Sequence, residues 1–124
     1  MRRRAKVDSN EIEIVNRLRD KGYVVYRICG RADSESSGVP DLVVAYSIAK
    51  EGKPGIVERS ETILLEIKDG EKPPSQRKLA DNQLVFGKTW PGRYAVVLNV
   101  KEALDACEYE LLKTRGINVQ KNRR

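Results

Sequence analysis

The chain has 124 residues with a hydrophobic share of 40%, which fits one globular domain with its own core. Lysine and arginine (24) outnumber aspartate and glutamate (18), so the net charge of +6 favours polyanionic partners, although a solvated basic surface explains the same excess. Histidine is absent and Cys29 and Cys107 lie far apart, which excludes zinc fingers, Ser-His-Asp triads and histidine acid–base chemistry.

The two ends of the chain are basic. We expect a basic arm over residues 1–7, a domain over 8–116 and a basic tail over 117–124. Such ends can wrap phosphate backbones, or they can serve solubility alone. The candidate DNA-binding residues of the arm are Arg2, Arg3 and Arg4. With no apolar stretch of membrane length and no apolar segment after the arginines, we expect a cytoplasmic, reduced protein without a membrane partner.

The first elements are a helix and a strand. Residues 8–21 form the predicted helix, which Asp8 or Ser9 can cap and Gly22 ends. Its apolar face is predicted to carry Ile12, Val15 and Leu18. The β-branched and aromatic run 23–28 predicts a strand, and the polar run 30–38 predicts a loop.

Two further strands follow. Residues 39–46 predict a strand with Pro40 at its start, since proline has no N–H to donate. Residues 47–61 hold glycines, a proline and mixed charges, which indicates a surface excursion. Residues 62–68 predict a third strand, and the three strands are expected to form an antiparallel meander.

The second half of the chain adds a helix, a strand and a helix. A turn over 69–75 precedes a helix from Ser75 to about Lys88, with Leu79 and Phe86 pointing inward. Residues 94–98 are apolar throughout and predict a strand buried on both faces. The last predicted helix begins after an Asn99 cap, with Glu102 at the capping-box position, and ends at Gly116. The order αβββαβα predicts an α/β fold with a mixed sheet flanked by helices.

Glu66 and Lys68 are unusual in an apolar strand. Side chains alternate along a strand, so these two share one face, opposite Leu65 and Ile67. A solvated outer face is one explanation. Glu51-Gly52-Lys53 has the same spacing in a predicted loop, where the pattern carries no function.

Asp41 strengthens the functional interpretation. It opens the preceding strand, so a hairpin between the two strands would bring it beside Glu66 and Lys68. Two neighbouring carboxylates repel each other unless a cation lies between them, which invites Mg²⁺. Lys68 could then orient a metal-bound water or offset charge on a phosphate. The arrangement suits phosphodiester hydrolysis.

The segments Val39-Pro40-Asp41 and Leu65-Glu66-Ile67-Lys68, in this strand order, resemble the signature of the PD-(D/E)XK nuclease superfamily. The superfamily's restriction-endonuclease-like αβββαβ core is similar to the predicted order. Glu11 resembles a glutamate of archaeal Holliday junction resolvases, and the run 68–79 followed by Gln83 resembles the VRR-NUC branch. Gln76 is the alternative glutamine. The longer loop between the second and third strands departs from compact resolvases.

The resemblance implies a metal site and a set of catalytic residues. The implied ligands of Mg²⁺, which Mn²⁺ would replace, are Asp41, Glu66 and the Ile67 carbonyl, with Glu11 in support. Lys68 would be the catalytic lysine, and Gln83 would hold water or phosphate. Glu11 also suits the dipole of a helix's first turn, and Gln83 also suits a helix surface.

Three more residues are candidates for contacts with nucleic acid. Arg27 and Arg31 flank the polar loop and could bind phosphates, or they could simply be exposed. Trp90 follows a helix end, which favours a core plug over a base-stacking platform.

The expected function is that of a metal-dependent DNA endonuclease on branched DNA, similar to a Holliday junction resolvase and acting as a homodimer without a nucleotide cofactor. The alternatives are a nuclease on flapped, nicked or single-stranded DNA, a DNA-binding module that does not cleave, and an unrelated α/β protein if the hairpin does not form.

Overall fold

The computed structural model describes residues 10–28 and 38–114, with side chains as far as residue 108. Its elements in chain order are α1 (Glu11–Asp20), β1 (Val24–Arg27), β2 (Leu42–Lys50), β3 (Lys53–Ile67), the 3-10 turn η1 (Pro74–Gln76), α2 (Asp81–Thr89), β4 (Arg93–Val97) and α3 (Val100–Thr114). This order confirms the predicted α/β class. The basic arm and tail, the caps at Asp8 or Ser9, Arg31 and the helix end at Gly116 lie outside the described residues.

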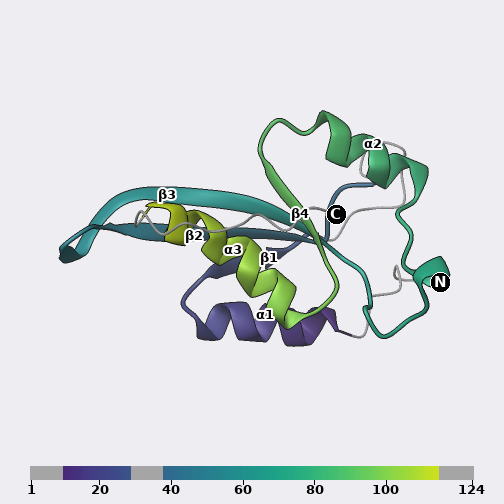
Figure 1. The fold of residues 1–124 in the computed structure, drawn as a ribbon, viewed down its shortest axis with the longest axis horizontal. Coiled ribbons are helices and arrows are strands. Elements are labelled where there is room, and N and C mark those ends of the chain that lie inside the picture. The colour runs from purple at the N-terminus through teal and green to yellow at the C-terminus, as the bar shows by residue number, and fades with distance from the viewer. Residues whose placement is uncertain (1–9, 29–37, 115–124) are drawn as a thin grey trace, which may run out of the picture.

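The described strands form one mixed sheet in the order β1-β2-β3-β4. The first three pair antiparallel, which confirms the predicted meander, and β4 lies parallel to β3. α1 and α3 pack against each other on one face of the sheet, and α2 lies on the other side near one end of the strands (Figure 1).

The core lies between the sheet and the α1–α3 pair. Its buried side chains come from alternate positions of each strand and from one face of each of the two helices. They are Ile14, Val15, Leu18, Val25, Leu42, Val44, Tyr46, Ile48, Ile63, Leu65, Ile67, Val97, Ala103 and Cys107. The prediction for Ile12 is wrong, because it is 59% exposed and lies off the stripe formed by Ile14, Val15 and Leu18.

Residues 47–61 lie at the surface as predicted, but the expectation that they do not form strands is wrong. β2 and β3 continue through most of this segment as a two-stranded arm that extends beyond the helices (Figure 1). The turn is confined to Glu51 and Gly52, and Gly52 adopts a φ of 73° that favours glycine. Most of the arm is exposed on both faces, so its sequence lacks the alternation that identifies a half-buried strand.

The predicted helix over residues 75–88 is also wrong in its bounds. A 3-10 turn and an extended stretch come first, and α2 begins only at Asp81, where the Gln83 side chain accepts a hydrogen bond from the Ala80 N–H at 2.9 Å. Leu79 and Phe86 are half-buried, and α2 buries none of its residues fully. The prediction that β4 is buried on both faces is wrong, because its residues are half-buried on both faces and only Val97 is buried.

Two asparagines beside the strand ends hold the N-terminal ends of α1 and α3. The N–H of Glu102 donates to Asn99 Oδ1 at 2.8 Å, which confirms the predicted cap of α3. Asn10 precedes α1 and donates to the backbone oxygens of Lys68 and Leu98 at 3.2 and 3.0 Å. Within the described ranges, no helix is long and apolar enough to cross a membrane.

We expect stability to fall at alkaline pH. Burial raises the pKa of the Cys107 thiol from 9.0 to about 12, and burial together with the neighbouring Cys107 and Glu108 raises the pKa of Tyr23 from 10.0 to about 12. Because both groups ionise more easily in the unfolded chain, their contribution is complete below their usual pKa values and is lost as pH rises toward about 12.

Thermal unfolding measured from pH 8 upward should show this loss. Tyr23→Phe and Cys107→Ala should each flatten the decline of Tm with pH. Tyr26→Phe is the control, because Tyr26 is 66% exposed. An equal flattening in the control would contradict the assignment.

Candidate active site

Asp41 and Glu66 lie next to each other at one end of the β2–β3 hairpin. Leu42 is paired with Leu65, so the antiparallel register sets Asp41 opposite Glu66. Asp41 Oδ2 accepts a hydrogen bond from the Ile67 N–H at 2.7 Å, and the Asp41 carbonyl accepts one from the Ile28 N–H at 2.7 Å. Asp41 is therefore held from both neighbouring strands.

The segment before Asp41 is fitted closely against α2. Gly38 has a φ of 92°, and a Cβ at this position would lie 2.7 Å from the backbone oxygen of Asn82. Only glycine satisfies both the backbone angle and the close approach. Pro40 is fully buried and lies just before β2, as predicted for a residue without an N–H. Gly38 and Pro40 thus define how the chain enters β2 at Asp41.

Glu66 and Lys68 lie on the face of the sheet that α2 covers. Glu66 is only 3% exposed, and the Lys68 side chain is 17% exposed. Lys68 Nζ lies 3.9 Å from Glu66 Oε2, which is an ion pair without a direct hydrogen bond. A buried carboxylate costs free energy unless it is paired, so the lysine partly offsets the charge of Glu66.

Gln83 joins these two residues from α2. Its Oε1 accepts from Lys68 Nζ at 3.1 Å, and its Nε2 lies 3.4 Å from Glu66 Oε2 as a donor. The same Oε1 accepts from the Ala80 N–H at the start of α2, so the amide orientation is set by the helix itself. The structure therefore brings Asp41, Glu66, Lys68 and Gln83 together.

Glu11 and Arg27 form an ion pair on the α1 side of the same strand ends. Arg27 Nε donates to Glu11 Oε2 at 2.7 Å, and Glu11 is 6% exposed. The guanidinium that was predicted to contact phosphate is thus engaged by a carboxylate. The supporting role of Glu11 at the metal site and the contact of Arg27 with phosphate both stay predictions. Arg31 and the Arg2–Arg4 group lie outside the described residues.

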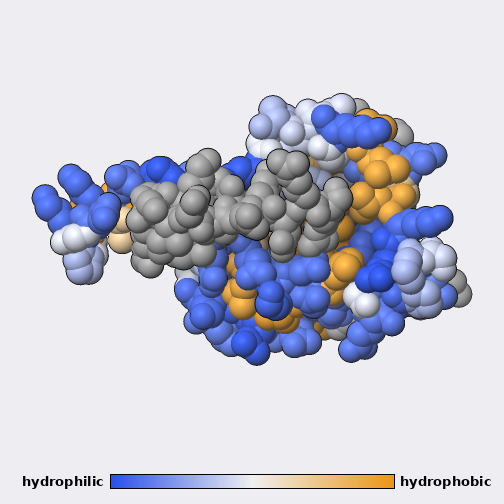
Figure 2. Space-filling view, viewed as in Figure 1, coloured by the Kyte–Doolittle hydropathy of each residue, from blue (hydrophilic) through white to orange (hydrophobic). Residues whose placement is uncertain are grey.

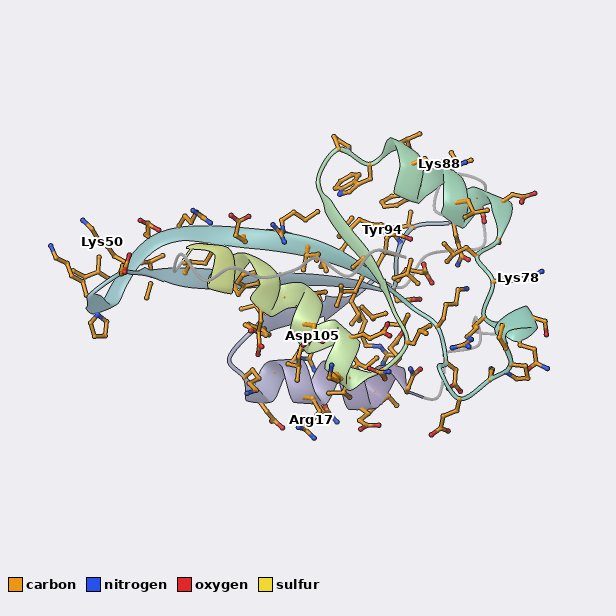
Figure 3. The ribbon with its side chains drawn as sticks, in the orientation of Figure 1. Arg17, Lys50, Lys78, Lys88, Tyr94 and Asp105 are labelled. Carbon is orange, nitrogen blue, oxygen red and sulfur yellow. The ribbon has the colours of Figure 1, made fainter. Side chains whose placement is uncertain are left out.

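Asp41 and Glu66 form the acidic pair of the site. Tyr94 is a neighbour of this pair that the sequence did not indicate. It is paired with Leu64 in parallel register, and alternation places it on the Glu66 face of the sheet. Burial, followed by the charges of Glu66 and Asp41, raises the pKa of the Tyr94 hydroxyl above its usual 10.0. Tyr94 extends from β4 toward α2 (Figure 3). Alternation along the strands predicts this position only when the pairing of β4 with β3 is known, and the sequence does not give that pairing.

The acidic pair suits a hard divalent cation. The described part of the chain holds no group of three or more Cys, Asp or Glu side chains that could bind a metal ion. Mg²⁺, however, is commonly held by one or two carboxylates and keeps several waters. Asp41, Glu66 and the Ile67 carbonyl supply oxygen donors of that kind, so the residues present fit Mg²⁺ or Mn²⁺.

Comparisons with known proteins found no similar protein. No model of a protein family matches the chain, and searches among curated proteins and among solved structures found no match either.

The pKa of Tyr94 should report on the acidic pair without any assay of activity. Glu66→Gln removes one of the charges that raise this pKa, so the pKa should fall toward 10.0. Mg²⁺ bound between Asp41 and Glu66 should lower it in the same direction. NMR titration of the tyrosine ring carbon would measure both changes.

Glu61→Gln is the control for this titration, because Glu61 lies on the same strand and pairs with Arg59. If neither Glu66→Gln nor Mg²⁺ changes the pKa of Tyr94, the result contradicts the arrangement of the site.

Proposed function

We propose that this protein is a divalent-metal-dependent endonuclease that hydrolyses DNA phosphodiester bonds, of the PD-(D/E)XK type. The observation that carries the proposal is the β2–β3 register, which sets Asp41 opposite Glu66 with Lys68 on the same face. The resemblance of the two strand segments to the superfamily signature supports it, as does the net charge of +6, which favours a polyanionic substrate.

Each residue has a role that follows from its chemistry. Asp41, Glu66 and the Ile67 carbonyl would hold the Mg²⁺ ion, which supplies Lewis acidity and lowers the pKa of water. The ammonium of Lys68 would stabilise negative charge on the phosphate in the transition state. Gln83 would keep Lys68 and Glu66 in their relative positions. The hydroxyl of Tyr94, which stays protonated near neutral pH, could donate a hydrogen bond to substrate.

The substrate and the assembly are further parts of this proposal. Branched DNA, a homodimeric enzyme, Mn²⁺ as a substitute metal and a supporting role for Glu11 all rest on the resemblance to resolvases. The competing substrates are flapped, nicked and single-stranded DNA, and the competing function is DNA binding without cleavage.

A nuclease assay would separate these functions. Purified protein is incubated with a labelled four-way junction, a flap, a nicked duplex, a linear duplex and a single strand, with Mg²⁺, Mn²⁺ or EDTA. We expect cleavage that requires metal, and a loss of roughly 100-fold or more in Asp41→Asn, Glu66→Gln and Lys68→Met.

The chain offers a matched control for two of these variants. Glu51 and Lys53 have the same spacing as Glu66 and Lys68 but lie at the exposed turn of the arm. Glu51→Gln and Lys53→Met should leave the rate unchanged. Metal-dependent cutting that survives Asp41→Asn would refute the site, and tight binding with no cutting of any substrate would favour the binding module.

Gln83→Ala should lower kcat by roughly tenfold while KM changes little, because the substitution frees Lys68 and Glu66 without removing either. Gln76→Ala is the control, since Gln76 is exposed in the 3-10 turn η1. Single-turnover rates for both variants would measure the effect. Equal rates in Gln83→Ala and the unaltered protein would exclude the positioning role.

A further inference from the structure

Trp90 lies at the end of α2 and is the only tryptophan in the chain. It is 43% exposed, so the prediction of a core plug is wrong. Leu84 and Val85, on the same helix, are 43% and 58% exposed. Figure 2 shows apolar surface over α2 among hydrophilic neighbours. Three exposed apolar side chains on α2 and at its C-terminal end favour a binding surface over single scattered residues.

The indole is held in a defined position. One face of the ring stacks on Phe86, with centroids 5.3 Å apart and an interplanar angle of 16°. Trp90 has the extended backbone expected before Pro91, and a Cβ on Gly92 would lie 2.7 Å from Trp90 Nε1. The close backbone at Gly92 and the Phe86 ring therefore fix the indole while nearly half of the residue stays in solvent.

The stack leads toward the acidic pair. The Phe86 ring is tilted against Tyr94 with centroids 5.7 Å apart, and Tyr94 shares the Glu66 face of the sheet. Tyr94 is paired with Leu64, two residues before Glu66 on the same face of β3, so the inner end of the stack lies toward the acidic pair. Trp90, Phe86 and Tyr94 thus form an aromatic row between the surface and the candidate active site.

The surroundings of the row suit a nucleic-acid strand. A flat aromatic ring with an exposed surface can stack on any base, because every base has a π-face. Lys88 lies in the last turn of α2, so the same end of the helix carries a cation for a phosphate (Figure 3). The net charge of +6 adds a general attraction for the backbone.

We propose that Trp90 is a stacking platform for an unpaired base of the strand that the Asp41–Glu66–Lys68 centre cleaves. This inference rests on the proposed nuclease function. Among the candidate substrates, it favours DNA with unpaired nucleotides beside the scissile bond, such as a flap or a single strand, over a fully paired junction. A base within a duplex is already stacked on its neighbours and cannot cover the indole.

The fluorescence of Trp90 provides a direct test, since no other tryptophan contributes. In EDTA, where metal-dependent cleavage is blocked, oligothymidylate should quench this fluorescence in a saturable way. An abasic oligomer of equal length and a blunt duplex should quench it little. In an anisotropy assay with labelled oligothymidylate, Trp90→Leu should weaken binding about tenfold, and Trp90→Phe should weaken it less.

Val57→Ser is the matched control, because it removes an exposed apolar side chain from the β2–β3 arm, outside α2, and it should bind normally. Equal quenching by the abasic oligomer, or unchanged binding by folded Trp90→Leu, would overturn the proposal. The proposal would also be overturned if the fluorescence changed with protein concentration but not with the oligomer. That result would assign the exposed apolar surface of α2 to a contact with a second copy of the chain. If Trp90→Leu does not fold, the quenching experiment and Trp90→Phe still decide the question.

The same experiment separates this inference from the proposed function. Quenching by oligothymidylate without cleavage in Mg²⁺ would support the platform and refute the nuclease. Cleavage in Mg²⁺ without quenching in EDTA would support the nuclease and refute the platform.

Discussion

The antiparallel register of β2 and β3 is the constraint on which the candidate site depends. With Leu42 paired to Leu65, the core-facing residues of both strands meet under α1 and α3, while Asp41 and Glu66 meet on the opposite face. A shift by one residue would turn all of these side chains over, burying charges in the core and exposing leucines. The free energy of burying the core therefore also fixes the position of the two carboxylates.

Another part of the site comes from α2, which contributes little to the core. α2 buries no residue fully, yet its Gln83 bridges Lys68 and Glu66 and its Phe86 packs on Tyr94. On the other face, Asn10 holds the start of α1 against the strand ends through Lys68 and Leu98. α2 thus reaches the site through polar and aromatic contacts, without a fully buried apolar side chain of its own.

The order of the elements, the meander and the Asn99 cap could all be predicted, because each depends on local spacing or on one capping side chain. Two of the errors have a common cause. The arm over residues 47–61 and the exposed Trp90 both belong to parts of the chain that are not enclosed by other elements, where apolar periodicity carries no information. The late start of α2 depends on the Gln83 hydrogen bond to Ala80, which no pattern of apolar residues indicates.

By itself, the sequence determined which residues share a strand face, because alternation follows from backbone geometry, and it predicted that a hairpin would bring Asp41 to Glu66 and Lys68. Only the tertiary structure decided that Gln83 bridges Lys68 and Glu66, that Arg27 pairs with Glu11, and that Tyr94 and Trp90 form an aromatic row with Phe86. These contacts join residues from separate elements. Their distances depend on how helices pack on the sheet, which is a property of the whole chain and not of any local segment.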